Sequence, residues 1–304
     1  MRILITGANG FIGSNLTKYL VGLGKYKVYA LVRYRSKLNS LINIRNSITI
    51  VKVKPSFKSI NTAICKVKPD VVVHLAASWP IEHNFRQIKP IINSNILFPT
   101  FLVEAMIKNN IFCMVNTGSF WEQMKSGQDN IPVNLYAASK ICFENILRYY
   151  ADAKNLRFIT LKLFGVYGPN GPRGKIFSLL KKSLTIKKPV LLSPGKQVID
   201  LIYINDVVDA YEKAIQYVYK KDNSKPELFF IGSGRGLKLR NIGRIFERCA
   251  GGSLNVKWGG RPYRTREIMY SKADNRLTKK RLKWKPKFNL KDGINDMLKK
   301  ESNI

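Results

Sequence analysis

Acidic residues are scarce in this chain of 304 residues, where 19 aspartates and glutamates stand against 53 lysines and arginines. Histidine occurs only twice, and the four cysteines, Cys65, Cys113, Cys142 and Cys249, show no short paired spacing. We therefore expect neither a metal site nor a disulfide framework, and reduced thiols are typical of the cytoplasm. We find no apolar stretch long enough to span a membrane, and the first expected strand begins at residue 2, so a cytoplasmic protein without a membrane partner is indicated.

The formal net charge of +34 is dispersed along the chain. Lysine clusters such as Lys181-Lys182 and Lys279-Lys280 fall among ordinary periodic segments, with no groove-reading motif near them. A basic surface can bind nucleic acid, but without such a motif we expect solvated surface and no nucleic-acid partner. The same positive potential would concentrate an anionic small-molecule substrate.

The first half of the chain alternates Val/Ile-rich runs with amphipathic stretches, the pattern of a parallel sheet covered by helices on both faces. Strands are predicted at residues 2–6, 27–32, 48–53, 71–75, 112–116 and 157–164, and helices at 11–23, 60–67, 91–108 and 136–153. Beyond residue 167, prolines and glycines make the pattern irregular. The predicted fold is α/β, with a Rossmann doubly wound parallel sheet at 1–167 to which 198–222 return, and a smaller, mixed C-terminal substrate-binding region at 168–197 and 223–304.

A glycine-rich loop follows the first predicted strand directly and opens the first predicted helix. This is the context of a dinucleotide fingerprint, because the cofactor's pyrophosphate needs a tight turn, a close backbone and the positive end of a helix. The cofactor contacts predicted here are Gly7, Asn9, Gly10, Phe11, Ile12 and Gly13.

The end of the second strand distinguishes NAD from NADP, since an acidic residue there binds the ribose of NAD and an arginine accommodates the 2′-phosphate of NADP. This chain has Arg33 at that point, with Arg35 and Lys37 close behind. The sequence therefore favours NADP(H), with NAD(H) as the alternative.

Tyr136 and Lys140 are four residues apart on a predicted helix, so their side chains project from one face. A nearby ammonium favours the phenolate, which would bring the high pKa of tyrosine closer to the working range. For carbonyl reduction Tyr136 would then donate its proton, and both Tyr136 and Lys140 are also predicted to contact the cofactor. Thr117, at the end of the fifth strand, would hydrogen-bond the same substrate oxygen.

Together these residues resemble the extended short-chain dehydrogenase/reductase family, and within it the nucleotide-sugar epimerases, dehydratases and reductases. The landmarks, in chain order, are TGANGFIG at 6–13, DVVVHLAA at 70–77, Asn95, YAASK at 136–140, LFGVYGP at 163–169, DLIYIND at 200–206 and WKP at 284–286. The resemblance implies that Leu75, Ala76 and Ala77 pass along the cofactor and that Leu163 and Val166 back the nicotinamide. It also implies a homodimer that packs the Tyr136 helix and its neighbour into a four-helix bundle.

Departures from the family pattern narrow the chemistry. In the 4,6-dehydratases an Asp-Glu pair follows the catalytic threonine, whereas Gly118 and Ser119 occupy those positions here, so dehydration is not expected. The fucose-synthase type of epimerase–reductase uses a Cys and a His, but His74 and Cys113 lie inside predicted strands. Gly165 stands where many relatives carry an asparagine that contacts the substrate phosphate.

Ketone reduction and epimerisation through a transient ketone remain. Arg33 favours exchangeable NADPH, and the run 116–122 with 134–140 looks most like the CDP-abequose or paratose synthase group, so we predict reduction of a nucleotide-linked 4-keto-6-deoxy sugar. The alternatives are a nucleotide-sugar epimerase that retains NAD and a non-catalytic dinucleotide-fold protein that binds RNA, against which the intact catalytic set argues. The expected substrate contacts are Ser78, Ser119 and Trp121 beside the nicotinamide pocket, and Arg235 and Arg264 on the diphosphate. A core aromatic and water-facing arginines are the plainer interpretations of the last three.

Overall fold

The computed structural model describes residues 1–80, 82–123 and 131–302. Seven parallel strands form the central sheet in the order β10-β6-β5-β4-β1-β2-β3. Their bounds are β1 Arg2–Thr6, β2 Lys27–Arg33, β3 Thr49–Val53, β4 Val71–His74, β5 Cys113–Ser119, β6 Arg157–Leu163 and β10 Glu227–Ile231. The strand order reverses between β1 and β4, and sheets of this kind bind ligands at the carboxyl ends of the strands beside that point. The predicted Rossmann fold is confirmed.

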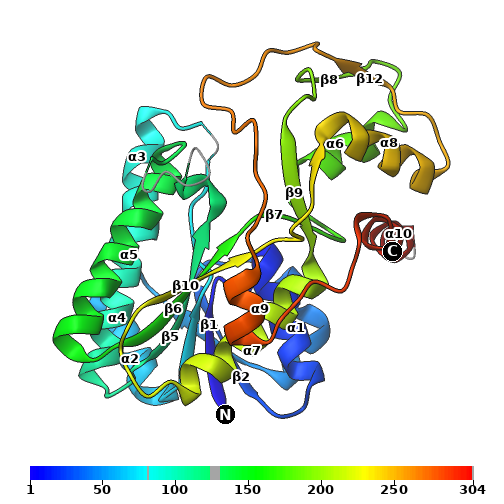
Figure 1. The fold of residues 1–304 in the computed structure, drawn as a ribbon. Coiled ribbons are helices and arrows are strands. Elements are labelled where there is room, and N and C mark those ends of the chain that lie inside the picture. The colour runs from blue at the N-terminus through cyan, green and yellow to red at the C-terminus, as the bar shows by residue number, and fades with distance from the viewer. Residues whose placement is uncertain (81, 124–130, 303–304) are drawn as a thin grey trace.

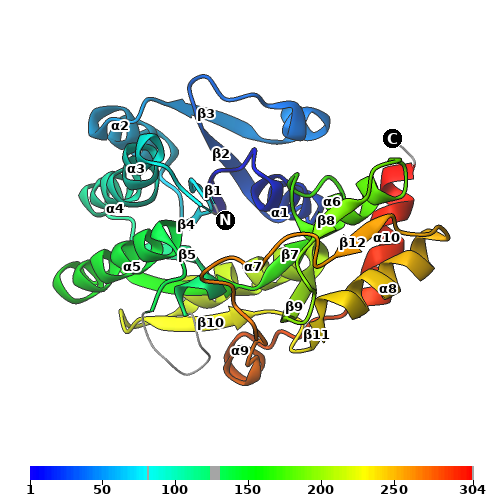
Figure 2. The same cartoon turned by 90° about the horizontal axis from the view of Figure 1, so that it is seen from above.

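Helices cover both faces of the sheet, as Figure 2 shows from above. One face is covered by α1 (Phe11–Gly22) and α7 (Ile204–Lys220), and the other by α2 (Phe57–Val67), α4 (Phe98–Lys108) and α5 (Leu135–Lys154). Successive strand side chains enter opposite layers, because side chains alternate along a strand. On β5, for example, Val115 packs with the α1/α7 layer and Met114 with the α2/α4/α5 layer.

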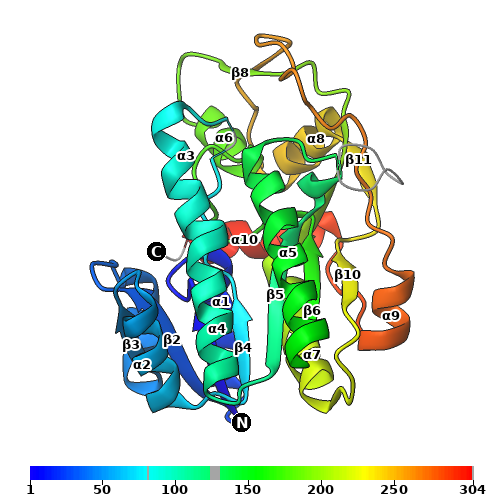
Figure 3. The same ribbon diagram turned by 90° about the vertical axis from the view of Figure 1, so that its left-hand side faces the viewer.

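A continuous helical run precedes β5 and lies beside α5 in Figure 3. It consists of α3 (Phe85–Ile92), a π-helical turn η2 (Asn93–Leu97) and α4. By length and composition alone, residues 85–108 would suffice to cross a membrane, contrary to the expectation from the sequence. The α4 part buries Leu102 and Met106 completely in the core, as a core helix of a globular domain does.

A smaller region stands above the sheet in Figure 1 and contains two short sheets. One joins β7 (Gly165–Tyr167), β9 (Val198–Tyr203) and β11 (Gly236–Lys238), and the other joins β8 (Val190–Leu192) to β12 (Val256–Trp258). The remaining helices are η1 Asn39–Ser47, η3 Phe120–Glu122, α6 Ile176–Ser183, α8 Leu239–Ala250, α9 Arg276–Leu282 and α10 Leu290–Ser302.

The observed division between the two regions differs from the predicted one at two strands. Within the segment 198–222 only α7 packs on the central sheet, because β9 pairs with β7 and β11 instead. Conversely, β10, predicted in the substrate region, pairs in parallel with β6 and buries Phe229 and Ile231 completely. The predicted and observed ends of β5 also differ. This strand continues to Ser119 because residues 117–119 stay in register with 161–163 of β6.

The C-terminal segment is fastened to α7. The Trp284 indole donates a hydrogen bond to the Asp206 backbone oxygen at 3.1 Å. The Asp206 carboxylate accepts the backbone N–H groups of Lys287 and Phe288 at 2.9 and 3.1 Å. Two of the sequence landmarks, at 200–206 and 284–286, are therefore structural partners.

Candidate active site

The glycine loop forms a cradle that side chains would fill. Gly7 has φ of +67°, a conformation that suits glycine, and a Cβ there would lie 2.8 Å from the Ala76 nitrogen. A Cβ on Gly13 would lie 2.1 Å from the Gly7 oxygen. Gly10 precedes α1 in extended conformation, so the first N–H groups of the helix face the loop. These features fit a dinucleotide, whose pyrophosphate needs close backbone and a helix N-terminus.

A buried hydrogen-bond network fastens the segment after β4 to this loop. The Thr6 hydroxyl oxygen accepts the backbone N–H groups of Leu75 and Ala76, both at 3.2 Å. It also contacts His74 Nδ1 at 2.8 Å. Burial lowers the pKa of His74 well below its ordinary value, with the nearby Lys140 as a second cause, so the ring is neutral at neutral pH. The structural role expected of His74 fits this geometry, and Leu75 and Ala76 are held against Gly7.

The basic segment after β2 lies beside the glycine loop. Asn9 donates from its side-chain amide to the Lys37 oxygen at 3.1 Å and accepts the Ser40 hydroxyl on its backbone oxygen at 2.9 Å. Arg33 ends β2 with an exposed side chain, and Arg35 is exposed as well. The loop that carries these cations is therefore tied directly to the fingerprint.

Tyr136 and Lys140 lie in the first two turns of α5. The Asn134 side chain caps this helix by accepting the Ala137 N–H at 3.0 Å. Asn95, in the π-helical turn, bonds both backbone groups of Ser78 and donates to the Ser139 hydroxyl at 2.9 Å. The segment after β4 and the start of α5 are thus held together by one amide.

Two residues with hydroxyl groups, Thr117 and Ser119, lie on the same face of β5 because they are two positions apart. Their hydroxyls have different partners. The Thr117 hydroxyl lies 2.7 Å from the hydroxyl of Tyr211 on α7, and both residues are buried. The Ser119 hydroxyl, two residues further along, hydrogen-bonds the Tyr136 side chain. Thr117, which was expected to hydrogen-bond the substrate oxygen, is thus paired with Tyr211 in this structure, and the hydroxyl that bonds Tyr136 is that of Ser119. Because β5 continues to Ser119, both hydroxyls lie near the carboxyl end of the strand.

The ionisation of the tyrosine differs from the expectation as well. Burial, followed by the charge of Glu122, raises the pKa of Tyr136, and the Ser119 hydrogen bond opposes them. Burial lowers the pKa of Lys140 to about 8, against the opposing charge of Glu122. The lowering of the tyrosine pKa that was expected from Lys140 is not among the effects on Tyr136 in this structure, and Tyr136 is a protonated donor at neutral pH.

A buried ion pair that the sequence analysis missed lies beside these residues. Glu122 Oε2 is 3.2 Å from the Lys162 ammonium, and Glu122 Oε1 accepts the Ser119 N–H at 2.5 Å. A Cβ on Gly118 would lie 2.9 Å from Glu122 Oε1 and 3.0 Å from Lys162 Cγ. The pair thus occupies the space of a side chain at position 118. No signal in the sequence links residues 40 positions apart on different elements.

Two tryptophan rings and a lysine lie near Tyr136. The Trp121 ring meets the Tyr136 ring edge to face at 6.3 Å between centroids. The Lys175 ammonium lies 5.1 Å from the Trp121 ring centroid and 4.9 Å from that of Trp79. Trp121 was predicted as a substrate contact, and so was Ser78, whose backbone is held by Asn95. Trp79 and Lys175 were not predicted.

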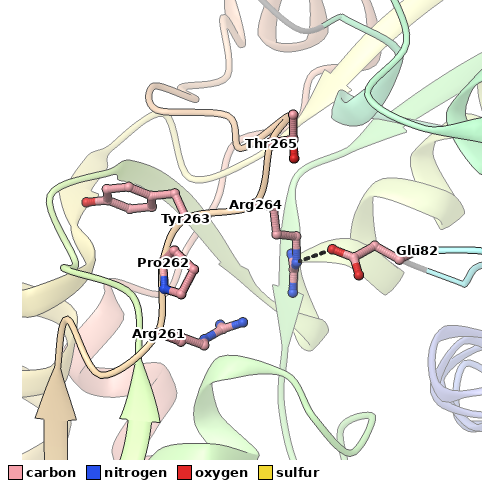
Figure 4. Close-up of a pocket in the computed structure, with 6 residues that line it drawn as sticks. All are labelled: Glu82, Arg261, Pro262, Tyr263, Arg264 and Thr265. Carbon is pink, nitrogen blue, oxygen red and sulfur yellow. Dashed lines mark ion pairs between the residues drawn. The ribbon is translucent and has the colours of Figure 1, made fainter.

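The two arginines predicted to bind the diphosphate, Arg264 and Arg235, have different surroundings. Arg264 lines a surface pocket with Arg261 and pairs with Glu82 at 3.7 Å, as Figure 4 shows. Arg266 fastens this segment to the start of α5 by donating to the backbone oxygens at residues 132 and 133. Arg235 is exposed ahead of β11 and does not belong to the described residues that line this pocket.

There is no room for a side chain at Gly165, the position where many relatives carry an asparagine. Leu163 is buried at the end of β6, and Val166 is half-buried in β7. A Cβ on Gly165 would lie 2.5 Å from the Leu201 side chain and 2.9 Å from the Asp200 oxygen. The close approach of β9 therefore explains the glycine.

Comparisons with known proteins agree with this geometry. A CDP-abequose synthase of Yersinia pseudotuberculosis is 29% identical over 88% of this chain and 91% of its own length. A second CDP-abequose synthase, of Salmonella typhimurium, is 28% identical over 98% of this chain and 97% of its own. Among solved structures, the UDP-glucose 4-epimerase of Thermotoga maritima, with UDP-glucose, has a TM-score of 0.88 at 23% identity, covering 100% of this chain and 99% of that one.

A UDP-glucuronic acid 4-epimerase of Bacillus cereus, in complex with UDP-glucuronic acid and NAD, has a TM-score of 0.87, also at 23% identity, with coverage of 100% and 99%. At such identities the likeness shows the fold. The description "NAD dependent epimerase/dehydratase family" belongs to the family whose model matches residues 3–232, more than half of the chain. The chain is therefore an oxidoreductase-type enzyme of the extended short-chain dehydrogenase/reductase group and belongs to the NAD-dependent epimerase/dehydratase family.

Proposed function

We propose that this protein reduces a nucleotide-linked 4-keto-6-deoxy sugar to the alcohol with NADPH. The observation that carries the proposal is the hydroxyl pair of Ser119 and Tyr136, next to Lys140 and a side-chain-free Gly118. Such a site can protonate a carbonyl oxygen. It has no carboxylate at positions 118 and 119 to carry out the acid–base steps of water elimination.

The cofactor would rest on residues of the glycine loop and of β2. Gly7, Gly10 and Gly13 would receive its pyrophosphate, and Arg33 with its neighbours after β2 would receive the 2′-phosphate of NADP. The Asn9–Lys37 bond supports this preference, because it holds the basic segment against the fingerprint. When bound, NADPH supplies a hydride to the carbonyl carbon and is oxidised to NADP⁺.

The chain's own groups complete the reduction. The Tyr136 hydroxyl donates its proton to the carbonyl oxygen, which becomes the new hydroxyl group. Ser119 donates a hydrogen bond to the same oxygen and so orients it. Lys140, charged below its lowered pKa of about 8, stabilises the phenolate that the proton transfer leaves. Thr117 would act from behind, through Tyr211, and not on the substrate oxygen.

The substrate class follows from the relatives together with the site. Two proteins named CDP-abequose synthase match this chain over most of its length, which supports a keto sugar on a nucleotide carrier. Ser78, Trp121 and the Lys175 ammonium would line the sugar, and Arg264 would meet the diphosphate after leaving Glu82. We also propose that two copies pack through α4 and α5.

An epimerase with retained NAD is the second candidate. It is favoured by the solved structures of similar fold, several of which are epimerases with NAD. Such an enzyme would return the hydride to the same carbon and consume no cofactor. The two candidates therefore differ in a measurable stoichiometry.

The test is absorbance at the wavelength of reduced nicotinamide, with NADPH or NADH and a panel of UDP-, CDP-, dTDP- and GDP-linked 4-keto-6-deoxy sugars. Stoichiometric loss of NADPH with one sugar, and the alcohol in the product, is the expected result. Bound NAD in the purified protein, with no net cofactor loss on any sugar, would instead establish the epimerase.

A further inference from the structure

A buried ion pair lies at the edge of the candidate site without taking part in the reduction as described above. Glu122, at the end of η3, is 1% exposed, and Lys162, on β6, is 6% exposed. Two charges removed from water cost several kcal/mol each, and their attraction repays this only in part, so a pair like this contributes little net stability. Its presence next to reacting groups therefore needs another explanation.

The pair is built into the site through Ser119. The Glu122 carboxylate accepts the Ser119 N–H and pairs with Lys162, so both of its oxygens are engaged. The hydroxyl of that same Ser119 hydrogen-bonds Tyr136. Gly118 leaves the space that the carboxylate and the lysine stem fill. A displacement of Glu122 would therefore move the hydroxyl that meets the proton donor.

The charges that face Glu122 come from two elements. Lys162, on β6, pairs with it directly, and α5, which packs against η3, carries Tyr136, Lys140 and Glu144, each of which interacts electrostatically with the carboxylate. Lys140 in turn faces the uncharged His74 on β4. Lys162 is not among the groups that act on Tyr136 or Lys140, whereas Glu122 acts on both. The carboxylate is thus the counter-charge shared by the catalytic tyrosine and lysine.

We propose that Glu122, paired with Lys162, is a positioning residue that keeps Tyr136 as a phenol and Lys140 as an ammonium. The proposal rests on the proposed function, since these two protonation states are the ones that a reductase needs. A negative charge beside a phenol opposes its ionisation, and the same charge beside an ammonium opposes its deprotonation. The pair would thereby extend proton donation to higher pH.

The consequence is a pH effect of one sign. Without the Glu122 charge, the pKa of Tyr136 and the pKa of Lys140 both fall. Whichever group limits the reaction, activity is then lost at lower pH than in the wild type. A purely structural role of the pair would lower activity evenly at all pH values.

The experiment compares the wild type with Glu122→Gln, with the double variant Glu122→Gln/Lys162→Met, and with Glu212→Gln as the matched control. Glu212 is also a buried carboxylate paired with a lysine, but it does not act on Tyr136 or Lys140. The double variant removes both charges, so it leaves no unpaired buried cation that could prevent folding. NADPH affinity from protein fluorescence and kcat/KM with the 4-keto sugar are measured from pH 6 to pH 10.

We expect the alkaline limit of both NADPH affinity and kcat/KM to move down by roughly one pH unit in both Glu122 variants, and to stay in place in Glu212→Gln. An unmoved limit in the folded double variant would overturn the proposal. Absence of turnover with every keto sugar would contradict the proposed function, while the NADPH titration would still decide the role of Glu122.

Discussion

Two buried carboxylates, each paired with a lysine, lie in different regions of the molecule, and their pKa values are shifted in opposite directions. Glu212, on α7, accepts hydrogen bonds from Lys25 and Tyr26 at 2.8 and 2.7 Å. Burial raises its pKa, but these partners together outweigh burial and the pKa of Glu212 is lowered. At Glu122 burial prevails over the attraction of its lysine, and the pKa is raised. The Glu212–Lys25 pair therefore stabilises the fold. The Glu122–Lys162 pair instead holds a carboxylate whose charge is unfavourable beside Tyr136.

Tyrosine substitutions should separate the two regions most strongly. Tyr136→Phe removes the proton donor and is expected to lower kcat by roughly 10²–10⁴-fold, the contribution of a positioned general acid. Tyr26→Phe, which removes a hydroxyl from Glu212, should leave kcat within about twofold, since it lies outside the site. Steady-state kinetics and NADPH binding by fluorescence test this. Undiminished turnover in Tyr136→Phe would refute its role.

Loss of the carboxylate should destabilise the two regions unequally. Glu122→Gln leaves Lys162 as an unpaired buried cation and should lower the free energy of unfolding by roughly 3–5 kcal/mol. Glu212→Gln should lose roughly 1–3 kcal/mol, because Lys25 is half exposed and regains water. Urea unfolding at neutral pH measures both.

The control for this difference is a second substitution at the site. Lys162→Met in the Glu122→Gln background should restore most of the lost stability, since apolar replacements of buried pairs are often neutral. If the double variant is no more stable than Glu122→Gln, the penalty arises from packing and not from the unpaired charge.

The two hydroxyls on β5 provide a finer comparison within the site. Ser119→Ala removes the hydrogen bond to Tyr136 and should lower kcat/KM by roughly tenfold, the value of one hydrogen bond to a reacting group. Thr117→Ala should cost less than about threefold in kcat/KM, since its hydroxyl is paired with Tyr211. A larger loss from Thr117→Ala than from Ser119→Ala would restore Thr117 as the substrate-orienting residue.

The features that could be predicted from the sequence are those encoded by short spacing. The fingerprint at 6–13 needs a strand, a turn and a helix in succession, and each signal lies within a few residues. Tyr136 and Lys140 share a face because of one helical turn. Six of the seven strands of the sheet are predicted for the same reason, with ends misplaced by at most three residues.

The missed features depend on residues that meet only in the folded chain. Glu122 and Lys162, or Trp79 and Lys175, come from separate elements, and nothing in their local sequence marks the partner. The contact of Ser119 with Tyr136 lies beyond the predicted end of the fifth strand, in three further residues that pair with β6. Similarly, β10 joins the sheet by pairing with β6. A run of only five residues does not predict which strand it pairs with.

The smallest expected effect is on the free energy of unfolding at acid pH, through the carboxylate of Glu212. Because the pKa of Glu212 is lowered in the folded protein, the unfolded state binds more protons near the ordinary value of 4.5. The stabilisation by Glu212 is therefore complete above that value and is lost as the pH falls through the lowered pKa. The stability difference between the wild type and Glu212→Gln should shrink on acidification from pH 6 to pH 3. Urea midpoints over this range measure it, and a constant difference would show that Lys25 and Tyr26 leave the pKa of Glu212 unchanged.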